Sequence, residues 1–319
     1  MSLGEFDLIA KYFTRPVTRA ALGVGDDCAL LSTSPGMQLA VSSDMLVEGR
    51  HFLSTIAPDR LGHKALAVNL SDLAACGAKP LAFTLALAMP RVDERFLEGF
   101  ARGLLVLADA YGCELIGGDT TQGPLNLCIT VFGEVPQGAA LLRSGARAGD
   151  DLYVSGTLGD ARLALEAFRG TLALAGDAFE RVRVAMEQPQ ARVALGLALR
   201  GVATSAIDVS DGLLGDLAHV LQRSNVGAEL RVDALPRSDD LRALPEALQR
   251  TCTLAGGDDY ELVFTAPPAR AAQVAAAALA AQVVVTRIGR IEVAAGLRLI
   301  DRDGRALPNS FASFDHFKT

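Results

Sequence analysis

The hydrophobic positions in the first half of the chain follow two different periods, and each period predicts a kind of element. In residues 59–75 the apolar residues Leu61, Ala65 and Val68 recur at helical spacing, which predicts a helix with one buried face. Residues 38–43 (QLAVSS) instead indicate a strand, which would deliver Asp44 at its end. The same criteria predict a second amphipathic helix at 93–111, strands at 114–116 and 125–134, and a loop (GGDTTQG) between those strands.

The second half of the chain repeats this mixture after a break at residues 136–150, which are rich in Gly, Ala and Arg. Residues 211–222 predict an amphipathic helix with Leu213, Leu217 and Val220 on its buried side. A helix ending at residue 168 should follow the turn SGTLGDA, and strands are predicted at 151–154, 205–209, 261–264 and 287–292. The sequence therefore predicts the α+β class, with two mixed α/β domains at 1–137 and 138–319 that meet at a shared site.

Composition narrows the classes of function. Of the 319 residues, 50% are hydrophobic and 21% are charged, as in an ordinary globular protein long enough for two domains. The formal net charge is −7 and no basic run occurs, which argues against a nucleic-acid partner and an anionic membrane. The five cysteines are widely spaced without a Cys-x-x-Cys pair, so neither a zinc site nor a disulfide framework is expected. The chain carries no predicted signal peptide, and its longest apolar stretch, 269–285, indicates an alanine-rich helix running into a strand, so we expect a cytoplasmic protein.

Aspartate is concentrated at short, glycine-flanked segments, most of them beside small or apolar residues where a carboxylate is costly. If Asp26, Asp27, Asp44, Asp72 and Asp119 converge in the fold, each pair of charges about 4 Å apart repels by about 4 kcal/mol at an effective dielectric of about 20. Such a cluster needs cations, and Mg²⁺ fits best because it takes oxygen ligands and is usually completed by substrate phosphates. The six acidic segments are GVGDDCA (23–29), SSDMLVEGRH (42–51), NLSDLAACGA (69–78), IGGDTTQG (116–123), IDVSDGLLGD (207–216) and GGDDYE (256–261).

Common phosphate-binding motifs do not account for these segments. GVGDDC departs from Gly-x-Gly-x-x-Gly at Cys28, which we expect to be a small buried residue, and no lysine completes a P-loop. Phosphate would instead meet metal, the backbone N–H groups of the GGDTTQG loop and Arg143. His51 follows the Asp44 segment and is a candidate for substrate contact, whereas His219 should be structural, on the inward side of helix 211–222.

Eight motifs, taken in order, resemble the thiamine-monophosphate kinase family. They are GEFDLIA, GVGDDCA, SSDMLVEGRHF, KALAVNLSDLAACGA, LIGGDTT, SAIDVSDGLLGDL, GGDDYEL and the terminal FDHF. Each motif alone is weak, but the ordered set is specific and spans essentially the whole chain. The family belongs to the ATP-binding superfamily of aminoimidazole ribonucleotide synthetase and selenophosphate synthetase.

The resemblance implies transfer of the γ-phosphoryl group of ATP to thiamine monophosphate, with several Mg²⁺ ions, to give thiamine diphosphate and ADP. Because the chain offers dense acid without a candidate base or nucleophile, we expect direct in-line transfer. The resemblance also implies a homodimer whose N-terminal sheets join into a barrel, with nucleotide near the groove between domains and subunits. Residue by residue, it implies metal contacts at Asp27, Ser42, Ser43, Asp44, Asp72, Asp119, Asp208 and Asp211 (Asp27, Asp72 and Asp208 most critical), ATP contacts at Gly118, Asp119, Arg143 and Ser210, and substrate contacts at His51, Asp258 and Phe314.

Two positions depart from the family's pattern, and both concern the acceptor. Asp258 stands where the family commonly has Glu, which shortens the side chain by one methylene. Phe314 stands where Tyr or Trp is frequent, so the ring can stack but cannot donate a hydrogen bond. Two alternatives stay open: another ATP-dependent member of the superfamily, forming aminoimidazole ribonucleotide or selenophosphate, and a non-catalytic module that binds Mg-nucleotide.

Overall fold

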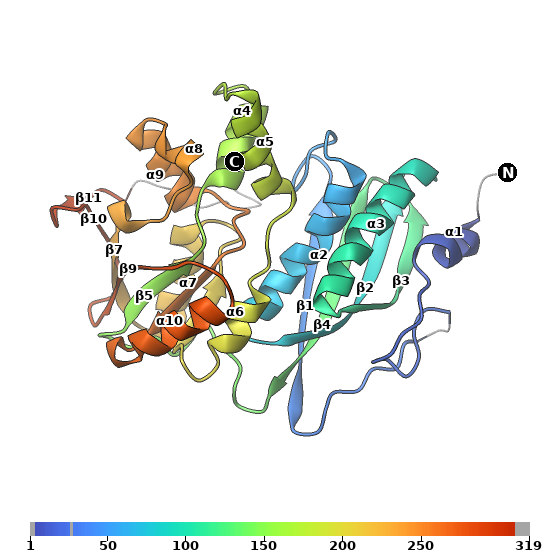
Figure 1. Ribbon diagram of the computed structural model, residues 1–319, viewed down its shortest axis with the longest axis horizontal. Helices are drawn as coiled ribbons and strands as arrows, with labels where there is room; N and C mark the ends of the chain where they lie inside the picture. The colour runs from blue at the N-terminus through green and yellow to red at the C-terminus, as the bar shows by residue number, and fades with distance from the viewer. Residues whose placement is uncertain (1–3, 26–27, 310–319) are drawn as a thin grey trace. The chain divides into compact units, whose positions relative to one another are not determined.

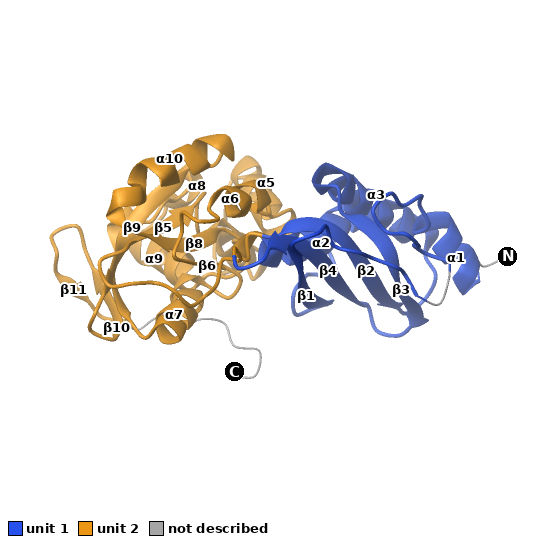
Figure 2. Cartoon of the chain, turned by 90° about the horizontal axis from the view of Figure 1, so that it is seen from below, with its two compact units in different colours: residues 1–73, 78–138 blue, residues 74–77, 139–319 orange. Residues whose placement is uncertain are grey.

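The chain folds into two compact units, each with its own sheet and helices. The structure is a computed structural model that describes residues 4–25 and 28–309. The first unit comprises residues 1–73 and 78–138, and the second comprises 74–77 and 139–319 (Figure 2). Both units mix helices with strands, which confirms the predicted mixed α/β character of the two parts. The functional roles expected for the two predicted domains stay predictions.

The first unit is built on a four-stranded sheet (Figure 1). Its elements are α1 (Glu5–Tyr12), β1 (Met37–Val47), α2 (Pro58–Ala75), β2 (Lys79–Met89), α3 (Glu94–Tyr111), β3 (Glu114–Gln122) and β4 (Asn126–Pro136). The strand order is β1-β4-β2-β3; β4 is antiparallel to β1 and β2, and β2 is parallel to β3. A parallel pair needs a crossover connection, and α3 supplies it between β2 and β3.

Helices α2 and α3 lie on one face of this sheet (Figures 1 and 2). Asp93 caps the start of α3, where its carboxylate accepts hydrogen bonds from two first-turn N–H groups, and Gly112 caps the end in the left-handed conformation (φ 57°). Leu97, Phe100 and Leu104 on α3 are completely buried. The helices predicted at 59–75 and 93–111 are therefore confirmed as α2 and α3.

Strand β2 corrects the sequence analysis, which predicts no element there. Its sequence, KPLAFTLALAM, is almost continuously apolar, so it lacks the alternation that marks a half-exposed strand. β2 lies between β4 and β3, and Phe83 and Leu87 are buried to 1% exposure or less. The predicted loop GGDTTQG is also wrong, because residues 117–122 belong to β3 and pair with β2 in parallel register.

The second unit is built on a seven-stranded sheet of mixed direction, in the order β11-β10-β7-β9-β5-β8-β6. Its strands are β5 (Asp151–Ser155), β6 (Ser205–Asp208), β7 (Gly227–Arg231), β8 (Leu262–Ala266), β9 (Val285–Glu292), β10 (Gly296–Ile300) and β11 (Ala306–Leu307). Its α-helices are α4 (Asp160–Phe168), α5 (Gly176–Glu187), α6 (Val193–Ala198), α7 (Leu213–Ser224), α8 (Asp239–Arg242), α9 (Glu246–Ala255) and α10 (Ala271–Ala280), and two short 3-10 helices are η1 (Val232–Ala234) and η2 (Pro268–Arg270).

Packing in the second unit confirms some predicted elements and adds others. The strands predicted at 151–154, 205–209, 261–264 and 287–292 are present as β5, β6, β8 and β9, and the helices predicted to end at 168 and to span 211–222 are α4 and α7. Leu213, Leu217 and Val220 of α7 are buried in the main core, as their spacing predicts. His219 is exposed, so its predicted inward, structural placement is wrong. No element was expected at α5, α6, α9, β7 or β10.

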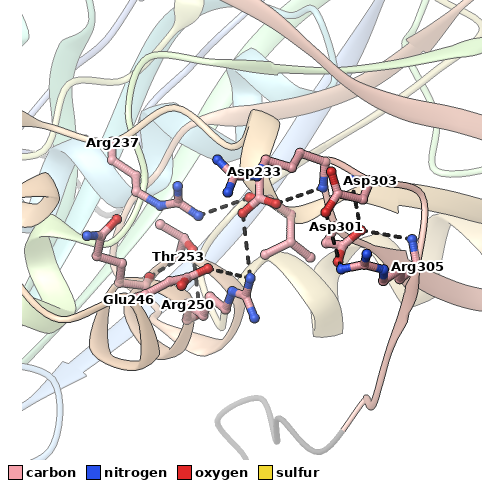
Figure 3. Close-up of polar contacts among 11 residues, drawn as sticks. Asp233, Arg237, Glu246, Arg250, Thr253, Asp301, Asp303 and Arg305 are labelled. Atoms are coloured by element: carbon pink, nitrogen blue, oxygen red, sulfur yellow. Dashed lines mark hydrogen bonds and ion pairs between the residues drawn. The ribbon is translucent and has the colours of Figure 1, made fainter.

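Within the second unit, polar contacts around Asp233 hold the segment that follows β10 (Figure 3). The Asp233 carboxylate accepts a hydrogen bond from the backbone N–H of Arg302 (2.8 Å) and faces the Arg250 guanidinium at 3.6 Å. The Asp301 carboxylate closes the turn between β10 and β11 by accepting from the N–H groups of Asp303 and Arg305. Within residues 4–25 and 28–309, none of the helices combines the length and apolar character needed to cross a bilayer.

Candidate functional site

Strand β1 carries three of the candidate metal ligands, and they do not share one face. The predicted strand ends at Ser43, but β1 runs to Val47, so Ser42, Ser43 and Asp44 alternate between the two faces of the sheet. Ser42 meets α2, where its Oγ donates to Oδ2 of Asp72 over 2.5 Å. The N–H of Asp44 donates to Oδ1 of Asn69 over 3.1 Å. Asn69 and Asp72 therefore project from one side of α2, as their spacing predicts.

Ser43 lies on the opposite, open face of the sheet. Its Oγ is 3.0 Å from Oγ1 of Thr130 and 3.4 Å from Sγ of Cys128, both on β4. Asp119 of β3 lies on this open face too, because it pairs with Ala86, which in turn pairs with Cys128, and directly paired residues share a face. The side chain of Asp119 is exposed.

The sheet separates the acidic residues of the first unit. β1 and β3 are its two edge strands, so three strand spacings, about 14 Å, lie between the strands of Asp44 and Asp119. In the part of the chain that the structure describes, no three His, Cys, Asp or Glu side chains are grouped so as to hold a metal ion. The expected convergence of these acids is thus not formed within the described part of one sheet; Asp26 and Asp27 lie outside the described residues.

Gly118 lets the β3 backbone approach β2 closely. Ile116 is the extra residue of a β-bulge, after which Gly117 pairs with Thr84 and Gly118 with Leu85. The φ of Gly118 is 148°, and a Cβ atom there would overlap the carbonyl oxygen of Leu85. Glycine is therefore required by the strand itself, and the next residue, Asp119, is held at a fixed position on the open face.

His51 sits in a tight turn that follows β1. The N–H of Val47 donates to its Nδ1 over 3.0 Å, and its own N–H donates to the Val47 carbonyl over the same distance. Since Nδ1 accepts a hydrogen bond, the neutral ring carries its proton on Nε2. The imidazole is half-buried, and an Nε2–H is chemically suited to donate to an anionic or carbonyl-bearing ligand.

In the second unit, β6 ends at Asp208 and leads into the loop that carries Ser210 and Asp211. Asp208 is 4% exposed, and the backbone N–H groups of Ser210, Asp211 and Gly212 all donate to Oδ2 of Asp216 over 3.0–3.1 Å. Burial first, and then the charge of Asp211, raises the pKa of Asp216 to about 7. The loop is thus wrapped around a buried carboxyl group at the start of α7.

The GGDDYE segment packs directly on this loop. The N–H of Asp258 donates to the Ser210 carbonyl over 2.9 Å, and the N–H of Tyr260 donates to the Val209 carbonyl over 2.8 Å. Asp258 and Tyr260 both have positive φ (67° and 50°), a strained conformation that the packing must maintain. The Tyr260 hydroxyl donates to Oδ1 of Asp258 over 3.1 Å, which orients that carboxylate. Ser210, Asp211 and Asp258 therefore lie on two adjoining loops, the first of which follows Asp208 at the end of β6.

Two further acids anchor the GGDDYE segment, and sequence reasoning missed both. Glu261 is 5% exposed; it pairs with the Arg192 guanidinium through both oxygens and accepts from Ser155 Oγ at 2.5 Å. Asp259 accepts the N–H of Gly159 at 2.9 Å, and burial raises the pKa of Asp259 well above its usual value. The sequence offers a weak signal for them, since an acid directly before a buried strand needs a partner.

Arg143 is exposed and follows Leu142, whose carbonyl accepts a hydrogen bond from the N–H of Ala206 on β6. The carbonyl of Arg143 itself accepts from Ser224 Oγ at the end of α7 (3.2 Å). Its backbone therefore lies about 10 Å from Asp208 along β6, within reach of a shared ligand but not in the same cluster. Phe314 lies outside the described residues, and Cys28 is exposed, not buried as expected.

Comparison with known proteins shows which families the two parts of the chain match. Residues 25–135 match the family described as AIR synthase related protein, N-terminal domain, and residues 147–302 match AIR synthase related protein, C-terminal domain. The thiamine-monophosphate kinase of Salmonella typhimurium is 44% identical to this chain over 326 residues, covering 100% of both sequences.

Two solved structures have the same fold. The crystal structure of thiamine-monophosphate kinase from Stenotrophomonas maltophilia K279a superposes with a TM-score of 0.86 at 44% identity, over 96% of this chain and 99% of that one. AaThiL complexed with AMPPCP and TMP superposes with a TM-score of 0.79 at 30% identity, over 90% of this chain and 89% of that one.

Proposed function

The chain belongs to the thiamine-monophosphate kinase family, and we propose that it carries out the reaction of that family, the ATP-dependent phosphorylation of thiamine monophosphate to thiamine diphosphate. The observation that carries this proposal is the 44% identity to a thiamine-monophosphate kinase over the full length of both sequences. The relative solved with AMPPCP and TMP supports a site for a nucleoside triphosphate beside the acceptor. ATP as co-substrate agrees with the cytoplasmic location that the sequence predicts.

The transfer needs no covalent help from the protein. The bond between the γ-phosphorus of ATP and the β–γ bridging oxygen breaks, a bond from that phosphorus to an oxygen of the acceptor phosphate forms, and ADP leaves. The acceptor phosphate is ionised near neutral pH, so no base has to remove a proton from it. We therefore propose direct in-line transfer without a phosphoenzyme, with the chain supplying position and charge.

The candidate residues fit magnesium by their chemistry, since they offer carboxylate and hydroxyl oxygens. When bound, several Mg²⁺ ions would offset the charge that two phosphate chains accumulate at close range. Asp72 and Ser42 share a hydrogen bond that would fix one such pair of oxygens, and Asp208 and Asp211 offer another from the second unit. The proposed metal contacts are Asp27, Ser42, Ser43, Asp44, Asp72, Asp119, Asp208 and Asp211.

The remaining candidate residues would bind and orient the two substrates. We propose that Gly118, Arg143 and Ser210 contact the nucleotide together with Asp119. His51 would donate its Nε2–H to the acceptor. Asp258 is aimed by Tyr260 and would contact the acceptor's organic part, where its shorter side chain favours a shifted or water-mediated contact. Phe314 would stack on the acceptor's heterocycle.

We propose a homodimer in which two four-stranded sheets join into a barrel. Leu39, Val41 and Met45 of β1 are 48–55% exposed on the open face of the sheet, where they would be costly in water. Both edge strands, β1 and β3, are available for pairing, and joining two sheets edge to edge would close a barrel around this face. β3 of one copy would then lie beside β1 of the other, so that Asp119 and Ser43 from different copies face the enclosed side of the barrel.

A substrate panel tests the activity directly. Purified protein with Mg²⁺ and ATP is offered thiamine monophosphate, thiamine or an aminoimidazole ribonucleotide precursor, and products are separated by chromatography. We expect thiamine diphosphate and ADP in equal amounts from thiamine monophosphate alone. Turnover of the aminoimidazole precursor instead would favour the sister activity, and nucleotide binding without any product would favour a non-catalytic module. A phosphorylated protein on the reaction path would contradict direct transfer.

Asp72→Asn tests the metal assignment within this activity. Asparagine can still accept the Ser42 hydrogen bond, so the fold should persist, while the loss of charge should lower kcat by about 100-fold or more. Asp59→Asn, in the first turn of the same helix, is the matched control and should keep near-normal kcat. A kcat close to that of the wild type in Asp72→Asn would contradict the assignment of Asp72 as a metal ligand.

A further inference from the structure

One buried carboxylate organises the loop on which much of the second unit's candidate site depends. Asp216 is 5% exposed, and its Oδ2 accepts three hydrogen bonds from consecutive backbone N–H groups: Ser210 at 3.0 Å, Asp211 at 3.1 Å and Gly212 at 3.1 Å. Three donors that converge on one oxygen leave the loop backbone a single arrangement. The directions in which Ser210 and Asp211 project their side chains are thereby fixed.

The local sequence explains why an aspartate at this position can do this. α7 begins at Leu213, with Gly212 as its N-cap residue. Asp216, in the first turn, reaches back past the start of the helix to the N–H groups of residues 210–212, while its own N–H donates to the Gly212 carbonyl over 3.0 Å. Gly212 has φ 119°, a conformation that a glycine adopts without strain and that lets the loop curl around the carboxylate.

The same loop also holds the GGDDYE segment. The Ser210 carbonyl accepts the N–H of Asp258, so the position of Asp258 depends on the backbone that Asp216 fixes. Oδ2 of Asp216 accepts hydrogen bonds from these three backbone donors, and its side chain lies in the interior of the unit, as does that of the neighbouring candidate ligand Asp208.

Resting on the proposed function, we infer that Asp216 is a positioning residue: it sets the loop that presents Ser210 and Asp211 to Mg-nucleotide and, through Ser210, sets Asp258 for the acceptor. It would contact neither metal nor substrate. Removing a group that orients a metal ligand without touching the metal typically lowers metal affinity or activity by about 10–100-fold. A carboxylate that served only to start α7 would contribute to stability alone.

The test compares Asp216→Asn and Asp216→Glu with Asp177→Asn, which removes an exposed first-turn aspartate from α5. Asn keeps the size but is a weaker acceptor, and Glu keeps the charge but is longer by one methylene. Each variant is measured for thermal unfolding, for binding of AMPPCP with Mg²⁺ by calorimetry, and for the Mg²⁺ concentration that gives half-maximal rate. All assays are run well below the unfolding transition.

We expect Asp216→Asn to weaken AMPPCP binding about 10-fold or more and to raise the half-maximal Mg²⁺ concentration several-fold, with partial recovery at high Mg²⁺. Asp216→Glu should lie between this variant and the wild type, and Asp177→Asn should match the wild type. The inference is overturned if Asp216→Asn has a lower unfolding temperature but the AMPPCP affinity and half-maximal Mg²⁺ concentration of the wild type. If Asp216→Asn does not fold, wild-type AMPPCP affinity and Mg²⁺ dependence in Asp216→Glu would overturn it equally. Wild-type protein that binds the analogue but makes no thiamine diphosphate would sink the proposed function while the calorimetry still decides the role of Asp216.

Discussion

Two adjacent glycines in the GGDTTQG segment should respond in opposite ways to the same substitution. Gly118→Ala places a Cβ inside van der Waals contact with the Leu85 carbonyl and forces alanine to φ 148°. Gly117→Ala places its Cβ 3.7 Å from Cγ2 of Thr84, which is ordinary contact, and Gly117 does not have a positive φ. The sequence alone gives no reason to treat these two residues differently.

The cost at Gly118 can be estimated from the strand geometry. A non-glycine residue in that backbone region costs about 1–3 kcal/mol. The overlap is with backbone, so it is relieved only by parting β2 from β3, and each ladder hydrogen bond lost there costs about 0.5–1.5 kcal/mol. Gly118→Ala should therefore lose about 2–5 kcal/mol of unfolding free energy, a large share of the roughly 5–15 kcal/mol typical of a folded domain.

Urea denaturation followed by far-ultraviolet circular dichroism measures the difference, with Gly117→Ala as the matched control. We expect Gly117→Ala to stay within about 1 kcal/mol of the wild type, since it changes one half-buried contact. Equal stability of the two variants would refute the close approach of β3 to β2. It would also return the segment to the loop that the sequence predicts.

Two further predictions concern acid stability and assembly. The N–H of Ser34 donates to the buried Glu134 carboxylate, and this hydrogen bond lowers the pKa of Glu134 in the folded state. The ionised carboxylate therefore stabilises the fold at pH values above the pKa of Glu in the unfolded chain, about 4.3. This stabilisation is lost as the pH falls through the lower pKa of the folded state. Glu134→Gln should accordingly cost about 1–2 kcal/mol of unfolding free energy at pH 7 and progressively less in acid. Glu98→Gln, on the exposed side of α3, is the control and should stay within about 0.5 kcal/mol of the wild type at pH 7. Val41→Glu should shift the protein to monomer in analytical ultracentrifugation while Val106→Glu, on α3, should not; an unchanged dimer in Val41→Glu, or a monomeric wild type, would contradict the barrel.

Sequence periodicity predicted the amphipathic elements because one face of each is buried. α2, α3 and α7 carry apolar residues at helical spacing, and β1 could be recognised from the run QLAVSS. β2 could not, because its open face carries mostly alanine, so the strand shows no polar alternation, and its Ala and Leu residues also suit a helix. Only pairing with β3 and β4, which are distant in sequence, decides its structure.

The candidate site was likewise predictable from the sequence only in part. The acidic segments can be recognised from composition, and the Asn69–Asp72 spacing correctly predicts a shared side of α2. What sequence reasoning could not supply is which face each residue takes. The family resemblance groups Ser42, Ser43 and Asp44 as metal contacts, whereas alternation along β1 turns Ser42 toward α2 and Ser43 to the open face.

Acidic residues in this chain perform two different tasks that composition cannot separate. Asp216, Glu134 and Glu114 each accept backbone N–H groups: from the loop before α7, from Ser34, and from residues 18–20. Glutamate or aspartate used in this way replaces missing secondary-structure partners and fixes an irregular segment. Asp119, in contrast, projects from regular strand on the open face. Among the three, Asp216 holds an irregular segment that carries candidate ligands, Ser210 and Asp211. Removing its carboxylate should therefore disturb ligand binding without removing any ligand contact, and the Asp216 variants test this directly.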